Sequence, residues 1–129
     1  MEKMYRITLS EEQLRLVSNC VEDVNRFASG QPELWYTLEN MLEGVESNEK
    51  TDRILEAREL LEKVKEILLP ELRSGAFKKY NTPGFIGNTY QIYRTILHQL
   101  TVDSNINNTY SSPTLPSGNM GTIKVERIS

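Results

Sequence analysis

The chain has 129 residues, of which 38% are hydrophobic and 26% charged, and its formal net charge is −3. This balance favours a soluble globular protein over a disordered one, and the length favours a single domain. The acidic charge argues against a protein that binds duplex nucleic acid, since such binding normally needs a basic face.

Cys20 is the only cysteine, so no disulfide forms within the chain and no cysteine–histidine metal set exists. A reducing cytoplasm is the natural setting for such a protein. No apolar run approaches the ~20 residues of a membrane span, and no signal peptide is visible. We therefore expect no membrane partner, no metal and no cofactor.

Residues 4–9 (MYRITL) alternate between apolar and polar side chains, which predicts a short strand. Ser10 followed by Gln13 is a capping-box arrangement and predicts the start of a helix, which Gly30 can end in a left-handed conformation. The apolar residues of this helix recur at helical spacing: Leu14, Val17, Val21, Val24 and Phe27.

Two more helices are expected in the middle of the chain. The first has Pro32 in its opening turn and ends at Gly44. Its expected buried side consists of Leu34, Trp35, Leu38, Met41 and Leu42. The next follows a polar loop over residues 45–50, with Thr51 as its cap, and ends before Pro70. Its apolar stripe consists of Ile54, Leu55, Leu61, Val64, Ile67 and Leu68.

Residues 70–87 indicate a structured loop, and a fourth helix is expected from about residue 85 to residue 100. The face of this helix that we expect in the core consists of Ile92, Tyr93, Ile96, Leu97 and Leu100. The segment that follows is polar and irregular, and residues 122–128 (TIKVERI) alternate again, which predicts a second strand.

These elements predict an α+β fold that is mainly helical, with about four helices and a small antiparallel sheet formed by the two terminal strands. The single domain spans residues 1–129, with the helices in 1–100 and a loop or lid plus the last strand in 101–129. A lone two-stranded ribbon is marginal in water, so the termini pair either within one subunit or between subunits of an oligomer.

The strongest candidate binding feature is a stripe on the fourth helix. Tyr90, Arg94 and His98 lie four residues apart, so they share one helix face. A ring stacks on a base, a guanidinium pairs with a phosphate, and an imidazole donates or accepts a hydrogen bond, so the three side chains would suit a nucleotide-like ligand. Alternatively, the two rings edge the core and the arginine pairs with an acid.

The loops on either side of this helix offer further rings and polar groups, among them Phe77, Asn108, Tyr110 and Ser112. Arg26 and Gln31, around Gly30, form a second group, although a cation in the last turn of a helix also simply favours the helix dipole. No nucleophile motif or phosphate-binding glycine loop accompanies the one histidine, so we expect no enzyme. A phosphodiester hydrolase that depends on His98 is the remaining catalytic alternative.

The order of these segments resembles a known family. A helix with NRFASGQ, a helix closing in PEL, an aromatic loop, a YxxYRxxxH helix and a tail with NNTYSSPT are similar to the phage Thoeris anti-defence sponges of the first described type. That family sequesters cyclic nucleotide immune signals made by bacterial TIR and cGAS-like enzymes. The resemblance covers most of the chain and is one of order and spacing.

The resemblance implies a homo-oligomer, from dimer to hexamer, in the host bacterial cytoplasm, with pockets between subunits. It implies that Arg94 and His98 hold the ligand, that Phe77 stacks on it, and that Arg26 and Gln31 serve a second site. The tail from Asn108 to Thr114 would form a lid. The loop after PEL departs from the family, which has an asparagine before a small–aromatic pair where this chain has Ser74-Gly75-Ala76-Phe77. The ligand therefore stays open between cyclic ADP-ribose isomers and cyclic oligonucleotides.

Overall fold

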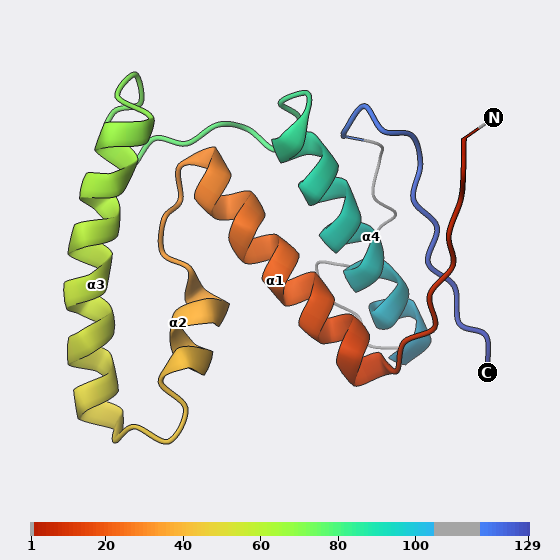
Figure 1. Ribbon diagram of the computed structural model, residues 1–129, viewed down its shortest axis with the longest axis horizontal. Coiled ribbons are helices and arrows are strands. Elements are labelled where there is room, and N and C mark those ends of the chain that lie inside the picture. The colour runs from red at the N-terminus through yellow and green to blue at the C-terminus, as the bar shows by residue number, and fades with distance from the viewer. Residues whose placement is uncertain (1, 105–116) are drawn as a thin grey trace.

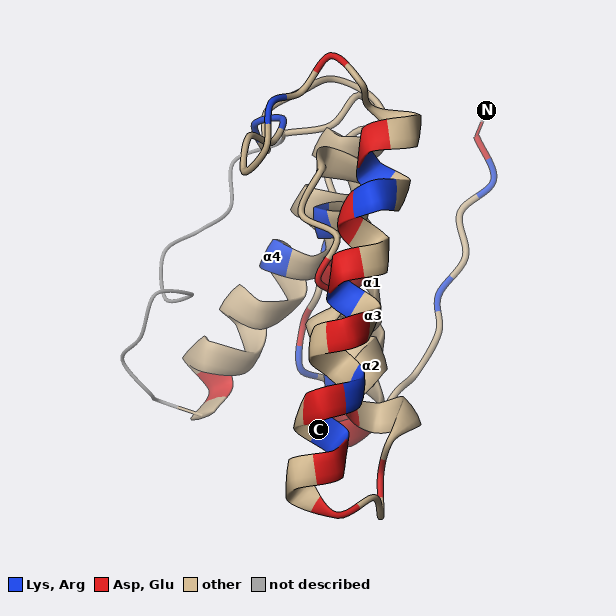
Figure 2. Cartoon of the chain, turned by 90° about the vertical axis from the view of Figure 1, so that its left-hand side faces the viewer, with Lys and Arg blue, Asp and Glu red and all other residues tan. Residues whose placement is uncertain are grey.

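The structure, a computed structural model, describes residues 2–104 and 117–129. Within these ranges it contains four helices, α1 (Glu11–Ser29), α2 (Trp35–Met41), α3 (Ser47–Leu68) and α4 (Phe85–Ser104). Figure 1 shows α3, α2 and α1 side by side, with α4 next to α1. In the turned view of Figure 2 the first three helices overlap and α4 lies to one side. The helices α1, α2 and α3 therefore form one layer, and α4 lies outside it.

The predicted sheet is wrong for the described part of the chain, which is all-helical and contains no strand. The two terminal segments lie close together in Figure 1 but apart in Figure 2, and no backbone hydrogen bond between them is found among the described residues. Alternating side chains favour an extended backbone, but a strand is stable only when a neighbour completes its hydrogen bonds. The alternation at the termini therefore did not produce a sheet.

The boundaries predicted for α1 are confirmed. The backbone N–H of Gln13 donates to the Ser10 hydroxyl over 3.1 Å, and the Ser10 N–H donates to the Gln13 side chain over 2.9 Å, which completes the capping box. At the other end Gly30 adopts a left-handed conformation with φ of 104°. Local sequence signals therefore set both ends of this helix.

The predicted starts of α2 and α3 are wrong by several residues. Pro32 precedes α2, which begins at Trp35 after Leu34. The α3 helix begins at Ser47 rather than after Thr51, because the Glu46 carboxylate accepts hydrogen bonds from two free amides of the first turn. Residues 47–50, expected to form a loop, thus belong to the longest helix that the structure describes.

The core lies mainly on α4. The buried hydrophobic residues are Ile54 on α3 and, on α4, Ile86, Tyr93, Ile96 and Leu100. Three of the five core residues predicted for α4 are therefore buried, and Ile92 and Leu97 are half-buried. The expected buried sides of α2 and α3 are wrong for the residues that are exposed: Trp35, Met41, Leu55, Ile67 and Leu68. Of the other residues expected there, Ile54 is buried and the rest are half-buried.

The α1 helix meets α4 through small polar side chains. The Asn25 amide donates to the Ile86 carbonyl over 2.7 Å and to the Thr89 hydroxyl over 2.8 Å, and the Ser18 hydroxyl donates to the Tyr93 carbonyl over 3.3 Å. These bonds fix how the two helices pack, because buried polar groups need partners. None of the helices described has both the length and the hydrophobicity that a bilayer span requires.

Candidate functional site

A cleft of about 250 Å³ lies where the end of α1, the loop after α3 and the first turns of α4 meet. We term it the aromatic cleft. Its lining residues are Asn25, Arg26, Ser29, Gln31, Phe77, Lys78, Lys79, Tyr80, Ile86, Tyr90 and Tyr93. Three separate segments thus contribute to one concave surface, as is common for small-molecule sites.

Two hydrogen bonds attach the loop to the helices. The backbone N–H of Lys78 donates to the Ser29 carbonyl at the end of α1 over 2.7 Å, and the buried Lys65 ammonium donates to the Ala76 carbonyl over 2.6 Å. Gly30 lies against the same loop, since a Cβ at this position would be only 2.9 Å from the Leu72 side chain. The loop that carries Phe77 is therefore held in a defined position.

Three tyrosine rings form one wall of the cleft. The rings of Tyr80 and Tyr90 stack with centroids 4.6 Å apart, and Tyr90 meets Tyr93 edge-to-face at 5.4 Å. Such pairs stabilise each other by about 0.5–1.5 kcal/mol beyond their buried area. Burial raises the pKa of the Tyr93 hydroxyl, and the charge of Glu22 acts in the same direction, so this hydroxyl remains neutral at physiological pH.

The charge of the aromatic cleft is positive. Its described lining includes Arg26, Lys78 and Lys79 but no carboxylate. Arg26 is already paired with Glu22 at 2.7 Å, whereas neither lysine forms an ion pair with a described residue. The lysines are thus the groups available to an anion, and the neighbouring rings offer flat apolar faces.

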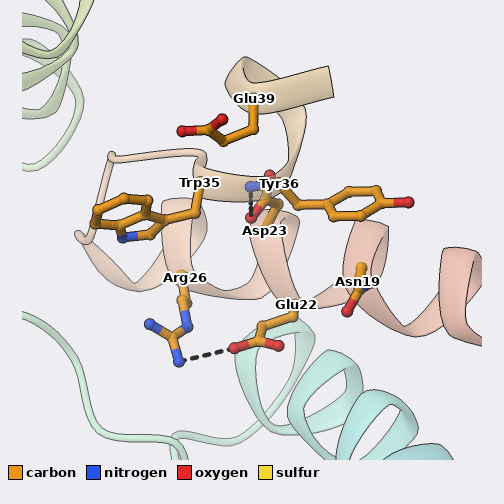
Figure 3. A pocket seen from close by; sticks show the side chains of 7 residues that line it. All are labelled: Asn19, Glu22, Asp23, Arg26, Trp35, Tyr36 and Glu39. Atoms are coloured by element: carbon orange, nitrogen blue, oxygen red, sulfur yellow. Dashed lines mark hydrogen bonds and ion pairs between the residues drawn. The ribbon is translucent and has the colours of Figure 1, made fainter. Parts of the chain in front are cut away.

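A second cleft, of about 390 Å³, separates α1 from α2 and is shown in Figure 3. We term it the acidic cleft. Its lining residues are Asn19, Glu22, Asp23, Arg26, Trp35, Tyr36 and Glu39. The Trp35 and Tyr36 side chains point in opposite directions in Figure 3, so they do not converge on a common ligand position.

The charged groups of the acidic cleft hold the helices together. Asp23 accepts hydrogen bonds from the first-turn amides of α2, that of Tyr36 over 3.2 Å and that of Thr37 over 2.6 Å. Glu39 pairs with Lys50 at 3.0 Å, and a guanidinium covers the Trp35 ring, with the Cζ of Arg58 3.8 Å from its centroid. This cleft is therefore better explained as a joint between helices than as a site for an anion.

The structure brings together four of the ten predicted site residues, which all line the aromatic cleft: Arg26, Gln31, Phe77 and Tyr90. Arg94 lies next to Tyr90 as its spacing predicted, with the guanidinium carbon 5.8 Å from the ring centroid, but it does not line either described cleft. His98 lies one turn further along α4, also outside both linings. The other four lie outside the described residues: Asn108, Tyr110, Ser112 and Thr114.

Some lining residues were not among the predicted site residues. Lys78, Lys79 and Tyr80 follow Phe77 in the sequence FKKY. This run of aromatic and basic residues could have indicated all four as site residues, but only Phe77 was predicted. The sequence around Asn25 gave no such signal, because the position of its side chain depends on a hydrogen bond to the Ile86 carbonyl, about 60 residues further along the chain.

Among the described residues, no three histidine, cysteine, aspartate or glutamate side chains are placed to hold a metal ion. Of the described features, the aromatic cleft is the one most suited to a ligand. Its rings and lysines would fit a planar anion. Comparison with known proteins finds no matching family model, no matching curated protein and no matching solved structure.

Proposed function

We propose that this protein binds a cyclic nucleotide immune signal in the aromatic cleft and sequesters it without cleaving it. In this proposal the protein is a phage anti-defence sponge that acts in the host bacterial cytoplasm as a homo-oligomer. The observation that carries the proposal is the stacked Tyr80–Tyr90 pair beside Lys78 and Lys79.

The chemistry of the cleft matches the two parts of a nucleotide. Phe77 is 54% exposed and lines the cleft, so its ring has a face available for stacking on a base. The two lysines supply positive charge for phosphates, and the neutral Tyr93 lies at the inner end of the ring cluster. A cleft of about 250 Å³ is small for a whole cyclic dinucleotide, so a second subunit would have to complete the site.

The direct test is ligand recovery. The purified protein is incubated with cyclic ADP-ribose isomers and with cyclic di- and trinucleotides, separated from free ligand and heated. Release of intact ligand supports sequestration. Linear products would make the protein a hydrolase, and a lack of binding to all of these ligands at micromolar concentration would contradict the proposal.

Substitution of Phe77 localises the site. Each stacked base contributes about 1–3 kcal/mol, so Phe77→Ala should weaken binding by about 5- to 150-fold in calorimetry. Phe85→Ala is the matched control, because Phe85 is 58% exposed and lies outside the described linings. Equal losses in both variants would place the ligand elsewhere.

A small oligomeric phage adaptor that acts through protein–protein contacts is the alternative function. The exposed apolar residues of α2 and α3, such as Met41 and Ile67, favour it. Pull-down from infected cells with wild type and with the Lys78→Ala/Lys79→Ala variant separates the two functions, because an adaptor's partner should still be captured by the variant.

A further inference from the structure

Phe77 is an exposed residue on a backbone that is held on both sides. It is 54% exposed, so its ring contributes little to the core. The Ala76 carbonyl, in the peptide group before it, accepts a hydrogen bond from the Lys65 ammonium over 2.6 Å. The Lys78 N–H, in the peptide group after it, donates to the Ser29 carbonyl over 2.7 Å. Both peptide planes next to the Phe77 Cα are thus held, and with them the direction in which the side chain leaves the backbone.

The two groups that hold Phe77 come from different helices. Ser29 is the last residue of α1, whereas Lys65 lies in the last turn of α3. Among the described helices α3 packs only against α2, so it does not reach the aromatic cleft by helix packing. The Lys65 side chain makes the connection, because its ammonium reaches the loop and its Cε would lie 3.4 Å from a Cβ at Gly30. One side chain of α3 therefore affects the shape of a cleft that α3 does not line.

Packing alone does not favour a lysine at position 65. The residue is 5% exposed, and a buried ammonium is unfavourable unless it is hydrogen-bonded or paired. Its described partners are the Ala76 carbonyl and the Glu62 carboxylate, which lies 3.8 Å away on the same helix. Replacement of a buried ion by an apolar side chain of similar volume is often neutral or stabilising. An apolar residue would therefore suit this position, unless the hydrogen bond to the loop is itself required.

We propose that Lys65 is a positioning residue of the aromatic cleft, which holds the Phe77 backbone so that the ring is in place before a ligand binds. The benefit is entropic, because a ring that is already held loses little freedom when a base stacks on it. Without the ammonium, the loop keeps its hydrogen bond to Ser29 and loses the one to α3. The effect on ligand affinity rests on the proposed function, whereas the effect on the loop does not.

Hydrogen exchange without ligand tests the effect on the loop. Lys65→Met removes the donor but keeps a long unbranched side chain that favours helix. Lys63→Met is the matched control, because Lys63 is exposed on the same helix. The Lys78 amide should exchange about tenfold faster in Lys65→Met and at the wild-type rate in Lys63→Met. An unchanged rate in Lys65→Met overturns the proposal. Loss of its helical circular dichroism signal would also overturn it, because Lys65 would then support the whole fold.

Calorimetry with cyclic ADP-ribose, cyclic di-GMP and cyclic tri-AMP tests the effect on affinity. Lys65→Met should weaken binding by about 5- to 20-fold, and Lys63→Met should not. In a Phe77→Ala background Lys65→Met should weaken binding no further, because Lys65 acts through the ring. Equal losses in both backgrounds, or wild-type affinity in Lys65→Met, would overturn the proposal. If the wild type binds none of these ligands, the proposed function fails, and the exchange rates still decide whether Lys65 holds the loop.

Discussion

The α1–α4 pair and the α2–α3 arm of this molecule are stabilised in different ways. The first contains four of the five buried hydrophobic residues, all on α4, together with the buried amide of Asn25. The arm buries one apolar residue, Ile54, and is held by single contacts such as those of Asp23 and Lys65. Figure 2 shows the same contrast in charge, since α3 is densely charged and α4 is almost uncharged. One region is thus stabilised by packing and the other by a few polar contacts.

The largest expected effect tests the packed pair. Ile96 is 4% exposed, so Ile96→Ala should lower the free energy of unfolding by about 2–5 kcal/mol through lost burial and a cavity. Leu60→Ala on α3, where the side chain is 58% exposed, should cost less than about 1 kcal/mol. Urea unfolding measures both, and equal losses would mean that the two regions do not differ as described.

A smaller effect tests the arm. Asp23→Ala removes the acceptor of the Tyr36 and Thr37 amides, which should cost about 1–2 kcal/mol in urea unfolding. Hydrogen exchange of these two amides should speed up more than that of α4. Asp52→Ala, at an exposed position of α3, is the control and should leave both measurements unchanged. An unchanged exchange rate in Asp23→Ala would show that this contact does not hold α2.

The smallest effect tests the cap of α3 and depends on pH. Hydrogen bonds from the amides of Asn48 and then Glu49 lower the pKa of the Glu46 carboxyl below its usual 4.5. A carboxyl group whose pKa is lowered by folding stabilises the fold above pH 4.5. This contribution is lost as the pH falls through the lowered pKa. The stability difference between wild type and Glu46→Gln should therefore shrink on acidification, and a constant difference would contradict the role of the charge.

Local signals were enough to predict much of the fold. The capping box at Ser10, the left-handed residue Gly30 and the stop before Pro70 depend on neighbours within a few residues, so the sequence shows them directly. The same holds for the spacing of Tyr90 and Arg94, which lie together as predicted. These features, set within one or two helical turns, were predictable, whereas the start of α3 was missed because Glu46, and not Thr51, caps its first turn.

Features set by distant parts of the chain were not. The start of α2 depends on Asp23, more than ten residues earlier. The buried face of α1 is the polar one, because the Asn25 and Ser18 side chains find carbonyls on α4 that no local pattern shows. The aromatic cleft needs the FKKY loop to reach the end of α1, through Lys78 and Ser29. Apolar periodicity alone did not show this buried face of α1, and it predicted a sheet that the described residues do not form.

Gly30 does not line the aromatic cleft, but it affects how two of the segments that form the cleft pack together. It ends α1, contacts Leu72 beyond the end of α3, and lies close to the Ala76 carbonyl in the loop that carries Phe77. A methyl group here would lie 2.9 Å from the end of the Leu72 side chain, and the φ of 104° is one that residues with a side chain rarely adopt. The loop that carries Phe77 can therefore lie against the end of α1, through Lys78 and Ser29, because residue 30 is a glycine.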